Sequence, residues 1–247
     1  MKVSFVVPCF NEEKLIERCL RSILTEIARS RALAEIVVVD NGSTDRTIEI
    51  VDAMTNHRGL HPWVLRAVQP RKGIVWARQT GHDVSVGEIV CCVDADNVVP
   101  GEWLDHVLRA FEDPEVVAVS GPVEFLGLSK RTEKASKAFY KLAAISHRYV
   151  ASMLQGGNYA YRRSALDKIG GYDTSVEFFG EDTRTAQLLS KVGKILYLPE
   201  MKVYSTDRRF VEQGLVKTTA KYVLNYIWVH LFGRPFSNNY VDLHHGA

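Results

Sequence analysis

The sequence predicts an α/β protein in which helices flank a mixed, mainly parallel sheet. Two observations lead to this prediction. Short apolar runs, such as residues 36–39 and 89–93, alternate along the chain with segments whose apolar residues recur at helical spacing. These runs are apolar at every position, which is typical of strands that helices cover on both faces.

The elements are expected in the following order. The first half contains predicted strands at 3–7, 35–39, 63–68 and 88–93, with predicted helices at 11–27, 48–54 and 74–86. The second half contains predicted helices at 103–111, 130–154 and 181–192, with predicted strands at 116–121, 159–161 and 195–199. The glycines Gly156 and Gly157 are expected to end the long helix before the next strand begins.

The composition fits one sizeable catalytic domain. At 247 residues with 46% hydrophobic content, the chain can bury a large core. Its 31 basic and 29 acidic residues leave a formal charge of +2, which lacks the single-sign field of a dedicated nucleic-acid-binding protein. No nucleic-acid partner is therefore expected.

The cysteines and the N-terminus predict a cytoplasmic protein. The cysteines show no zinc-binding spacing and are expected to be small buried residues in a reducing compartment: Cys9, Cys19, Cys91 and Cys92. The first residues run directly into a strand pattern, without the apolar core and cleavage site of a secretory signal.

Three residues stand at the ends of predicted strands and should meet at one edge of the sheet. Pro8, Asp40 and Asp94 each stand where a strand ends, and ligands of such sheets bind beyond the carboxyl ends of the strands. Asp94 and Asp96, separated by one residue, could share a hard cation such as Mg²⁺ or Mn²⁺. The alternative for this pair is an ordinary solvated turn.

The first two strand–helix turns favour hydrogen-bond acceptors over a phosphate site. The turn of residues 8–13 lacks a glycine-rich loop, and its carboxylates would repel a pyrophosphate. Because carboxylates in the first turn of a helix complement its dipole, the structural alternative is a capped helix with Asn11 as N-cap. Asp40 could accept the ring N–H of uracil, or the N1–H and amino group of guanine. The alternative role for Asp40 is to cap the next helix.

Two cations, Lys72 and Arg78, bracket a segment of small residues. Such a pair suits the charge of a nucleotide diphosphate, although by itself it would be an ordinary basic surface. Beside Asp94 and Asp96 it becomes a plausible clamp, because a diphosphate needs both positive side chains and a cation.

Taken together in chain order, these motifs resemble the family 2 glycosyltransferases of the GT-A (Rossmann-like) fold. The matching stretches are residues 6–13, 37–45, Lys72-Gly73 with Ala77-Arg78 and Gly81, 93–96, 156–158 and 180–182. The resemblance covers roughly residues 1–210, the predicted catalytic domain. It implies that one sugar is transferred from a nucleotide-sugar donor, with inversion at the anomeric carbon.

The resemblance also implies site roles. It assigns Asp182 as general base, Pro8, Glu12, Asp40, Lys72, Arg78 and Asp94 to the nucleotide, Asp96 and Asp94 to the metal, and Gly157, Asn158 and Glu181 to the acceptor or donor-sugar side. An inverting displacement needs a base on the face opposite the leaving group. The structural alternative for Glu181 and Asp182 is a helix cap.

The chain departs in two ways from the family that it resembles. Residues 204–209 contain no histidine where many members of that family supply a metal ligand, which leaves Asp207 as a weak candidate. The Gln-x-x-Arg-Trp motif of processive synthases is absent, so addition of a single sugar is expected.

Residues 211–247 form a predicted helical extension. Its apolar part, 222–232, is too short for the roughly 20 residues of a bilayer span. Three roles stay open for it: packing on the catalytic domain, a homodimer contact, or peripheral contact with the cytoplasmic face of a membrane.

The expected reaction transfers one sugar from a UDP- or GDP-sugar to a hydroxyl of a carbohydrate or lipid-linked acceptor and releases the nucleoside diphosphate, in cell-envelope or exopolysaccharide synthesis. One alternative is a noncatalytic nucleotide-sugar binding protein, which would need no base and therefore no Asp182. A sugar-nucleotide pyrophosphorylase is the other, but it would be expected to carry a glycine-rich basic loop near its N-terminus.

Overall fold

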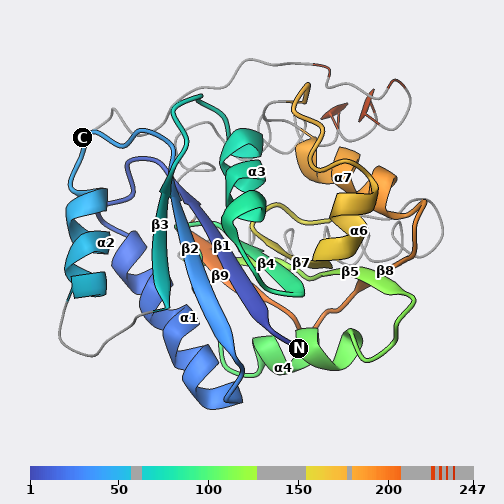
Figure 1. The fold of residues 1–247 in the computed structure, drawn as a ribbon, viewed down its shortest axis with the longest axis horizontal. Helices are drawn as coiled ribbons and strands as arrows, with labels where there is room; N and C mark the ends of the chain where they lie inside the picture. Colours follow the sequence, from blue (N-terminus) through green and yellow to red (C-terminus); the bar gives the residue numbers. More distant parts are fainter. Residues whose placement is uncertain are drawn as a thin grey trace.

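A computed structural model describes residues 1–56, 63–126, 154–176 and 180–206. It also describes six positions near the C-terminus: Leu224, Asn225, Trp228, Val229, Phe232 and Phe236. Within these residues the predicted α/β architecture is confirmed, with a central twisted sheet covered by helices (Figure 1).

The central sheet has seven strands in the order β3-β2-β1-β4-β7-β5-β8. Its strands are β1 (Val3–Cys9), β2 (Ala34–Asp40), β3 (Val64–Val68), β4 (Ile89–Val93), β5 (Val116–Ser120), β7 (Asn158–Arg162) and β8 (Lys194–Tyr197). The strands β3, β2, β1 and β4 are mutually parallel, and β5 pairs in parallel with β8. Of the strands described in this sheet, β7 alone runs antiparallel to its neighbours, which are β4 and β5.

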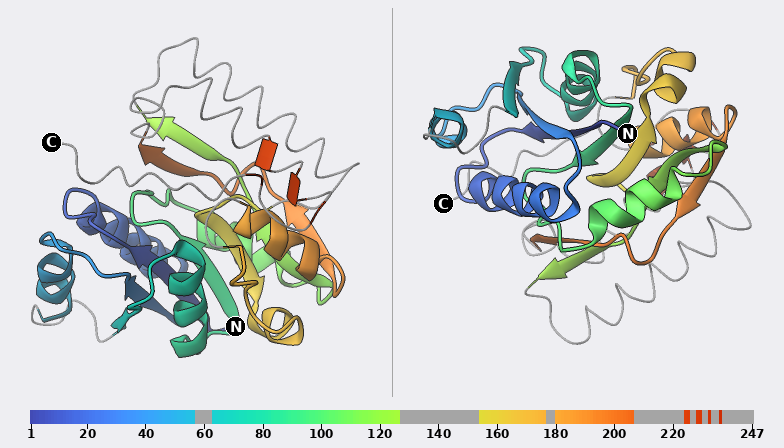
Figure 2. Two further views of the ribbon diagram at one scale, coloured as in Figure 1. Left: turned by 90° about the horizontal axis from the view of Figure 1, so that it is seen from above. Right: turned by 60° about the horizontal axis from the view of Figure 1, so that its bottom comes forward.

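A second, two-stranded sheet pairs β6 (Val123–Leu126) with β9 (Val203–Thr206) in parallel. It extends away from the main sheet in Figure 2. A single antiparallel bridge between Val98 and Tyr204 ties β9 to the segment that follows β4.

The helices form one layer on each face of the main sheet (Figure 2). One layer contains α1 (Ile16–Ser30), α2 (Thr47–Asn56) and α4 (Trp103–Ala110), and the other contains α3 (Ile74–Val84), α6 (Arg163–Lys168) and α7 (Glu181–Leu189). Alternate strand residues face opposite layers, so Phe5 joins the first core and Val6 the second. Gly81 allows α3 to lie close to β1, because an added Cβ there would collide with Val6.

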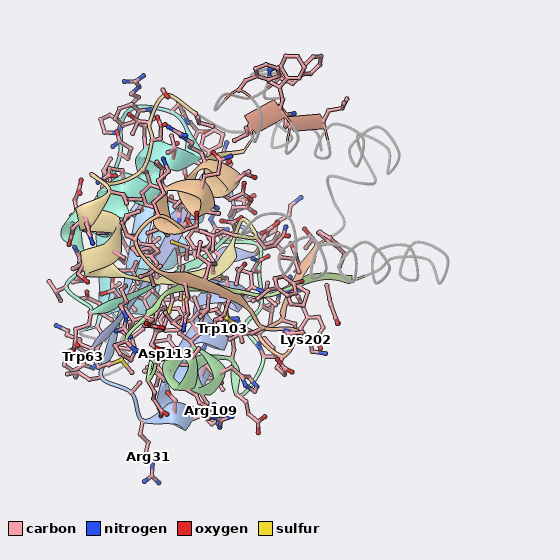
Figure 3. All side chains as sticks on the ribbon, turned by 90° about the vertical axis from the view of Figure 1, so that its right-hand side faces the viewer. Arg31, Trp63, Trp103, Arg109, Asp113 and Lys202 are labelled. Carbon is pink, nitrogen blue, oxygen red and sulfur yellow. The ribbon has the colours of Figure 1, made fainter. Side chains whose placement is uncertain are left out.

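The side-chain arrangement follows these layers. Trp103 of α4 is buried against the sheet, whereas Arg31 extends into solvent beyond the end of α1 (Figure 3). Among the described residues, no helix is both long and apolar enough to cross a membrane.

Most predicted elements are confirmed to within a few residues, but the start of the first helix is wrong. α1 begins at Ile16, with Leu15 at the N-cap, so Asn11 does not cap it. Asn11 instead has a positive φ of 54° in the loop between β1 and α1. The helix predicted at 130–154 and the extension predicted at 211–247 lie almost entirely outside the described residues.

Candidate active site

The parallel strands bring their carboxyl ends to one edge of the sheet. Pro8 is in register with Val39 and Cys9 with Asp40, while Asp94 directly follows β4 on the other side of β1. The predicted convergence of Pro8, Asp40 and Asp94 at one edge therefore follows from the observed topology.

Hydrogen bonds between the loops after β1 and β2 build one side of this edge. The backbone N–H of Glu12 donates to Thr47 Oγ1 at 2.7 Å, and Thr44 N–H donates to Asn11 Oδ1 at 2.8 Å. The side chain of Asn11 thus joins two loops instead of capping a helix. Glu12 is nearly buried, with 8% of its surface exposed.

Asp40 ends β2 and is also nearly buried. Its Oδ1 accepts a hydrogen bond from Ser43 N–H at 2.9 Å. Because α2 begins only at Thr47, the alternative in which Asp40 caps that helix is wrong. Burial, followed by the nearby charges of Asp40 and Glu12, raises the pKa of the Cys9 thiol, so Cys9 stays neutral beneath this acidic edge.

Asn41 holds the neighbouring loop in place, a role that sequence reasoning missed. Its Nδ2 donates to the carbonyl oxygens of Gln69 and Arg71, both at 2.8 Å, and its Oδ1 accepts from Gly73 N–H at 2.8 Å. All three bonds go to the segment that carries Lys72. The Asn-Gly pair after the strand indicated a turn, but not these distant partners.

Lys72 lies over the loops of β1 and β2. Its Nζ donates to the carbonyl of Gly42 at 3.0 Å and stands 3.3 Å from the centroid of the Phe10 ring. The ammonium group is therefore next to the Asp40 end of the site, and Phe10 is a second contact that the sequence did not reveal.

Arg78 is buried beneath the site, with 1% of its surface exposed. Its Nη1 contacts Glu181 Oε1 at 2.6 Å, and its Nη2 contacts Asp94 Oδ1 at 3.0 Å. The Tyr159 ring lies below the guanidinium, 5.6 Å away. The resemblance places Arg78 in the diphosphate region, and in the structure its terminal nitrogens contact that side through Asp94 and the start of α7 through Glu181.

Glu181 and Asp182 open α7, as predicted. Gly180 occupies the N-cap, so neither acid is the N-cap residue, although Asp182 accepts a hydrogen bond from an N–H of the first turn. Asp182 Oδ2 accepts from Gly156 N–H at 3.0 Å, and its Oδ1 accepts from Thr183 N–H at 2.7 Å.

Burial controls the protonation of both acids. Burial and the charge of Asp182 raise the pKa of Glu181 to about 8, and Arg78 partly opposes that rise. Burial also raises the pKa of Asp182, while Arg78 and the two backbone N–H groups lower it in part. The sequence could not decide this net direction.

Gly157 directly precedes β7 and lies against the Asp94 carboxylate. Its φ is +72°, and an added Cβ would lie 2.4 Å from Asp94 Oδ2. Its carbonyl accepts from Asn97 Nδ2 at 2.8 Å, which fixes the turn after Asp94. Any side chain at this position would enter the space of the Asp94 carboxylate.

Asn158 has a structural position instead of the predicted sugar-facing one. Its Oδ1 accepts from Trp103 Nε1 at 2.9 Å, and its Nδ2 donates to the carbonyls of Pro122 and Met201. The residue is completely buried. Both ends of its amide therefore join α4, the segment before β6 and the segment before β9.

The metal prediction depends on Asp94 and Asp96. They share a turn closed by a 3.0 Å bond from Asn97 N–H to the Asp94 carbonyl, and both charges act on the pKa of buried Cys19. Among the described residues, no group of three or more His, Cys, Asp or Glu side chains is placed to hold an ion. Asp207, the predicted weak ligand, lies outside those residues.

These residues nevertheless fit a hard divalent cation in part. Two carboxylates supply oxygen donors, and such cations commonly take their remaining ligands from phosphate and water. Asp94 is 35% exposed at its side chain, so one of its oxygens can serve a ligand while the other contacts Arg78.

Comparison with known proteins identifies the family. The family model described as glycosyl transferase family 2 matches residues 4–170, which is more than half of the chain. The chain belongs to glycosyl transferase family 2.

Two relatives illustrate the range of this family. An uncharacterized glycosyltransferase of Nostoc sp. is 27% identical over 215 residues, covering 83% of this chain and 64% of that protein. The glucosyl-dolichyl phosphate glucuronosyltransferase of Haloferax volcanii is 25% identical over 182 residues, covering 71% and 57%. The chain thus spans less than two thirds of either relative.

Solved glycosyltransferase structures share the GT-A fold. The mannosyltransferase PcManGT from Pyrobaculum calidifontis, in complex with GDP-Man and Mn²⁺, has a TM-score of 0.68 and 26% identity, covering 90% of this chain and 64% of that one. Glucosyl-3-phosphoglycerate synthase from Mycobacterium tuberculosis has a TM-score of 0.63 and 20% identity, covering 96% and 81%. The second likeness supports the fold alone.

Proposed function

We propose that this family 2 glycosyltransferase moves one sugar from a UDP- or GDP-sugar to an acceptor hydroxyl, with inversion at the anomeric carbon. The observation that carries the proposal is the Arg78 guanidinium, which contacts Asp94 and Glu181 at once. Arg78 thus links Asp94, which is assigned to the donor, with Glu181, which is next to the proposed base Asp182.

The nucleoside would bind between the loops after β1 and β2. Asp40 has one carboxylate oxygen occupied by Ser43 N–H, and the other could accept the ring N–H of uracil or guanine. Pro8 and Glu12 would border this pocket. Lys72, next to Phe10 and Gly42, would supply positive charge toward the nucleotide.

Asp94 and Asp96 would hold Mg²⁺ or Mn²⁺ together with the donor's diphosphate. When bound, such a cation offsets the negative charge that develops on the leaving diphosphate. PcManGT, which was solved with GDP-Man and Mn²⁺, supports a divalent cation and a nucleotide sugar for this chain. Gly157 would keep the space beside Asp94 open.

Asp182 would act as the general base. Its carboxylate is held by the N–H groups of Gly156 and Thr183, and it would take the proton from the acceptor hydroxyl as that oxygen attacks. A base whose pKa is raised above that of an ordinary aspartate is also a stronger proton acceptor.

The acceptor would be a carbohydrate or a lipid-linked sugar, as in cell-envelope or exopolysaccharide synthesis. The glucuronosyltransferase named for glucosyl-dolichyl phosphate supports a lipid-linked acceptor within the family. A reducing, cytoplasmic compartment suits the free cysteines Cys9, Cys19, Cys91 and Cys92.

A thermal-shift panel tests the donor half of this proposal. UDP, GDP and their common sugars would be added with and without Mn²⁺, and stabilisation by one nucleotide family in a metal-dependent manner is expected. Incubation of the stabilising donor with candidate acceptors, followed by NMR of the product anomer, tests inversion. Indifference to every nucleotide would contradict the proposal, and binding without any turnover would favour a noncatalytic nucleotide-sugar binding protein.

A further inference from the structure

Arg78 is the largest charged side chain among the fully buried residues that the structure describes. It projects from α3 and reaches two carboxyl groups on different elements. Asp94 follows β4, and Glu181 is the first residue of α7. The two contacts are 3.0 and 2.6 Å long and use separate nitrogens of one rigid guanidinium plane.

The surroundings of Arg78 leave it little freedom to turn toward a ligand. Tyr159 lies below the guanidinium, and the Tyr159 hydroxyl is hydrogen-bonded to that of Tyr172 at 2.9 Å. Gly156 stands close by: a Cβ added there would lie 3.9 Å from Arg78 Nη2 and 3.3 Å from Asp182 Oδ2. The cation therefore occupies a closed position between the sheet and the start of α7.

We propose that Arg78 is a positioning residue that fixes the start of α7 relative to the Asp94 turn. This inference rests on the proposed function, in which Asp94 serves the donor and Asp182 the acceptor. Because Asp182 follows Glu181 directly, the bond from Arg78 to Glu181 sets where the base stands. The bond from the same guanidinium to Asp94 sets the position of the Asp94 carboxylate on the donor side.

The chemistry of the side chain explains why arginine suits this position. A guanidinium presents several donors in a fixed plane and can bind two carboxylates at once, whereas an ammonium group is a single point charge on a flexible stem. A lysine at position 78 would keep the charge but could not hold both acids at these distances. The Arg78→Lys variant therefore separates charge from geometry.

The test uses Arg78→Lys, Glu181→Ala and the double variant. We expect Arg78→Lys to lower kcat by about 10- to 100-fold, because a misplacement of about 1 Å can cost that much in rate. Nucleotide affinity, measured by calorimetry in the presence of Mn²⁺, should fall by far less than kcat, even though the Asp94 turn loosens. The double variant should lose little more than the worse single variant, because both break the same link.

Arg163→Lys is the matched control. Arg163 also joins elements, through bonds to the backbone carbonyls of Gly87 at 3.1 Å and His82 at 2.7 Å, but it contacts none of the site carboxylates. It should lower thermal stability without the selective loss of kcat. An equal loss of kcat in Arg163→Lys would overturn the proposal, as would wild-type kcat in Arg78→Lys.

A second pattern of results would also overturn the proposal that Arg78 is a positioning residue. If Arg78→Lys weakens nucleotide binding while kcat at saturating donor is unchanged, Arg78 is a donor ligand and not a positioning residue. Should Arg78→Lys fail to fold, Glu181→Ala decides the question, since the inference requires it to lower kcat while nucleotide affinity is kept.

Hydrogen exchange supplies a readout that does not depend on turnover. In Arg78→Lys, amide exchange should rise both in the first turn of α7 and at Asn97, whose N–H closes the Asp94 turn. Unchanged exchange at either place would contradict the inference. If the wild type transfers no sugar but this paired rise occurs, the proposed function fails and the positioning role stands.

Discussion

The backbone N–H of Gly156 donates a hydrogen bond of 3.0 Å to Oδ2 of Asp182. Gly156 belongs to the turn before β7, and Asp182 to the first turn of α7. A Cβ at position 156 would lie 3.3 Å from the same carboxylate oxygen, so the turn approaches Asp182 closely. This contact orients the proposed base, and the first prediction follows from it.

Asp182→Asn should lower sugar transfer by about 100- to 10,000-fold, because an amide cannot take the acceptor's proton. Asparagine is isosteric and its oxygen can still accept one backbone N–H, so nucleotide binding should persist. Turnover and calorimetry with the stabilising nucleotide provide the measurement. Asp173→Asn, which removes a carboxylate bonded to Arg184 of the same helix, is the control and should remain active. Near-normal turnover of Asp182→Asn would exclude it as the base.

The rate should depend on pH through Asp182. Burial raises the pKa of this carboxyl in the folded protein, and a base works only when it is deprotonated. kcat should therefore rise with pH, and the midpoint of the rise should lie above about 4, the value of an unperturbed aspartate. A kcat profile recorded at saturating donor and metal checks this. A midpoint at or below that value would contradict the assignment.

Gly157→Ala should weaken metal-dependent nucleotide binding. The new methyl group would lie 2.4 Å from Asp94 Oδ2, and the positive φ of 72° adds strain. Gly170→Ala isolates the strain, since Gly170 has a φ of +86° with no atom within 4 Å of the added Cβ. Both variants should lose stability by about 1–2 kcal/mol. Only Gly157→Ala should also lose Mn²⁺-dependent affinity, and equal affinities would refute the steric argument.

Asn41→Asp should raise the donor KM with little change in kcat. Aspartate can still accept from Gly73 N–H, but it loses both donors to the carbonyls of Gln69 and Arg71. Leaving buried acceptors unpaired costs about 1–3 kcal/mol, and the loop that carries Lys72 should loosen. The double variant Asn41→Asp with Lys72→Met tests whether Asn41 acts on the donor KM through Lys72. If the two effects on KM simply multiply, Asn41 does not act through Lys72.

Much of the fold could be predicted because strands and helices leave local patterns in the sequence. Apolar runs in the sequence predicted β1, β2 and β4, and the rule that parallel strands end at one edge predicted that Asp40 and Asp94 lie together. The start of α7 at Glu181 was likewise predicted.

The errors arose where a side chain binds residues that are distant in sequence. The structural alternative for Asn11 was a helix cap, but its partner is Thr44 in the next loop. Arg78 was expected in the diphosphate region, but its contact with Glu181, more than one hundred residues away in the chain, left no local pattern. Asn158 was expected to face a sugar, yet it is bonded to Trp103. Local spacing carries no information about such pairings.

The position of β7 between β4 and β5 has a consequence for how the protein folds. Among the strands that the structure describes, β7 alone pairs with both β4 and β5, so these parts of the sheet join through residues 158–162. Contacts of such long sequence separation form slowly. During refolding, helical circular dichroism should recover before nucleotide binding does, since the turn that faces Asp94 and Asp182 is completed only when β7 has paired with its neighbours.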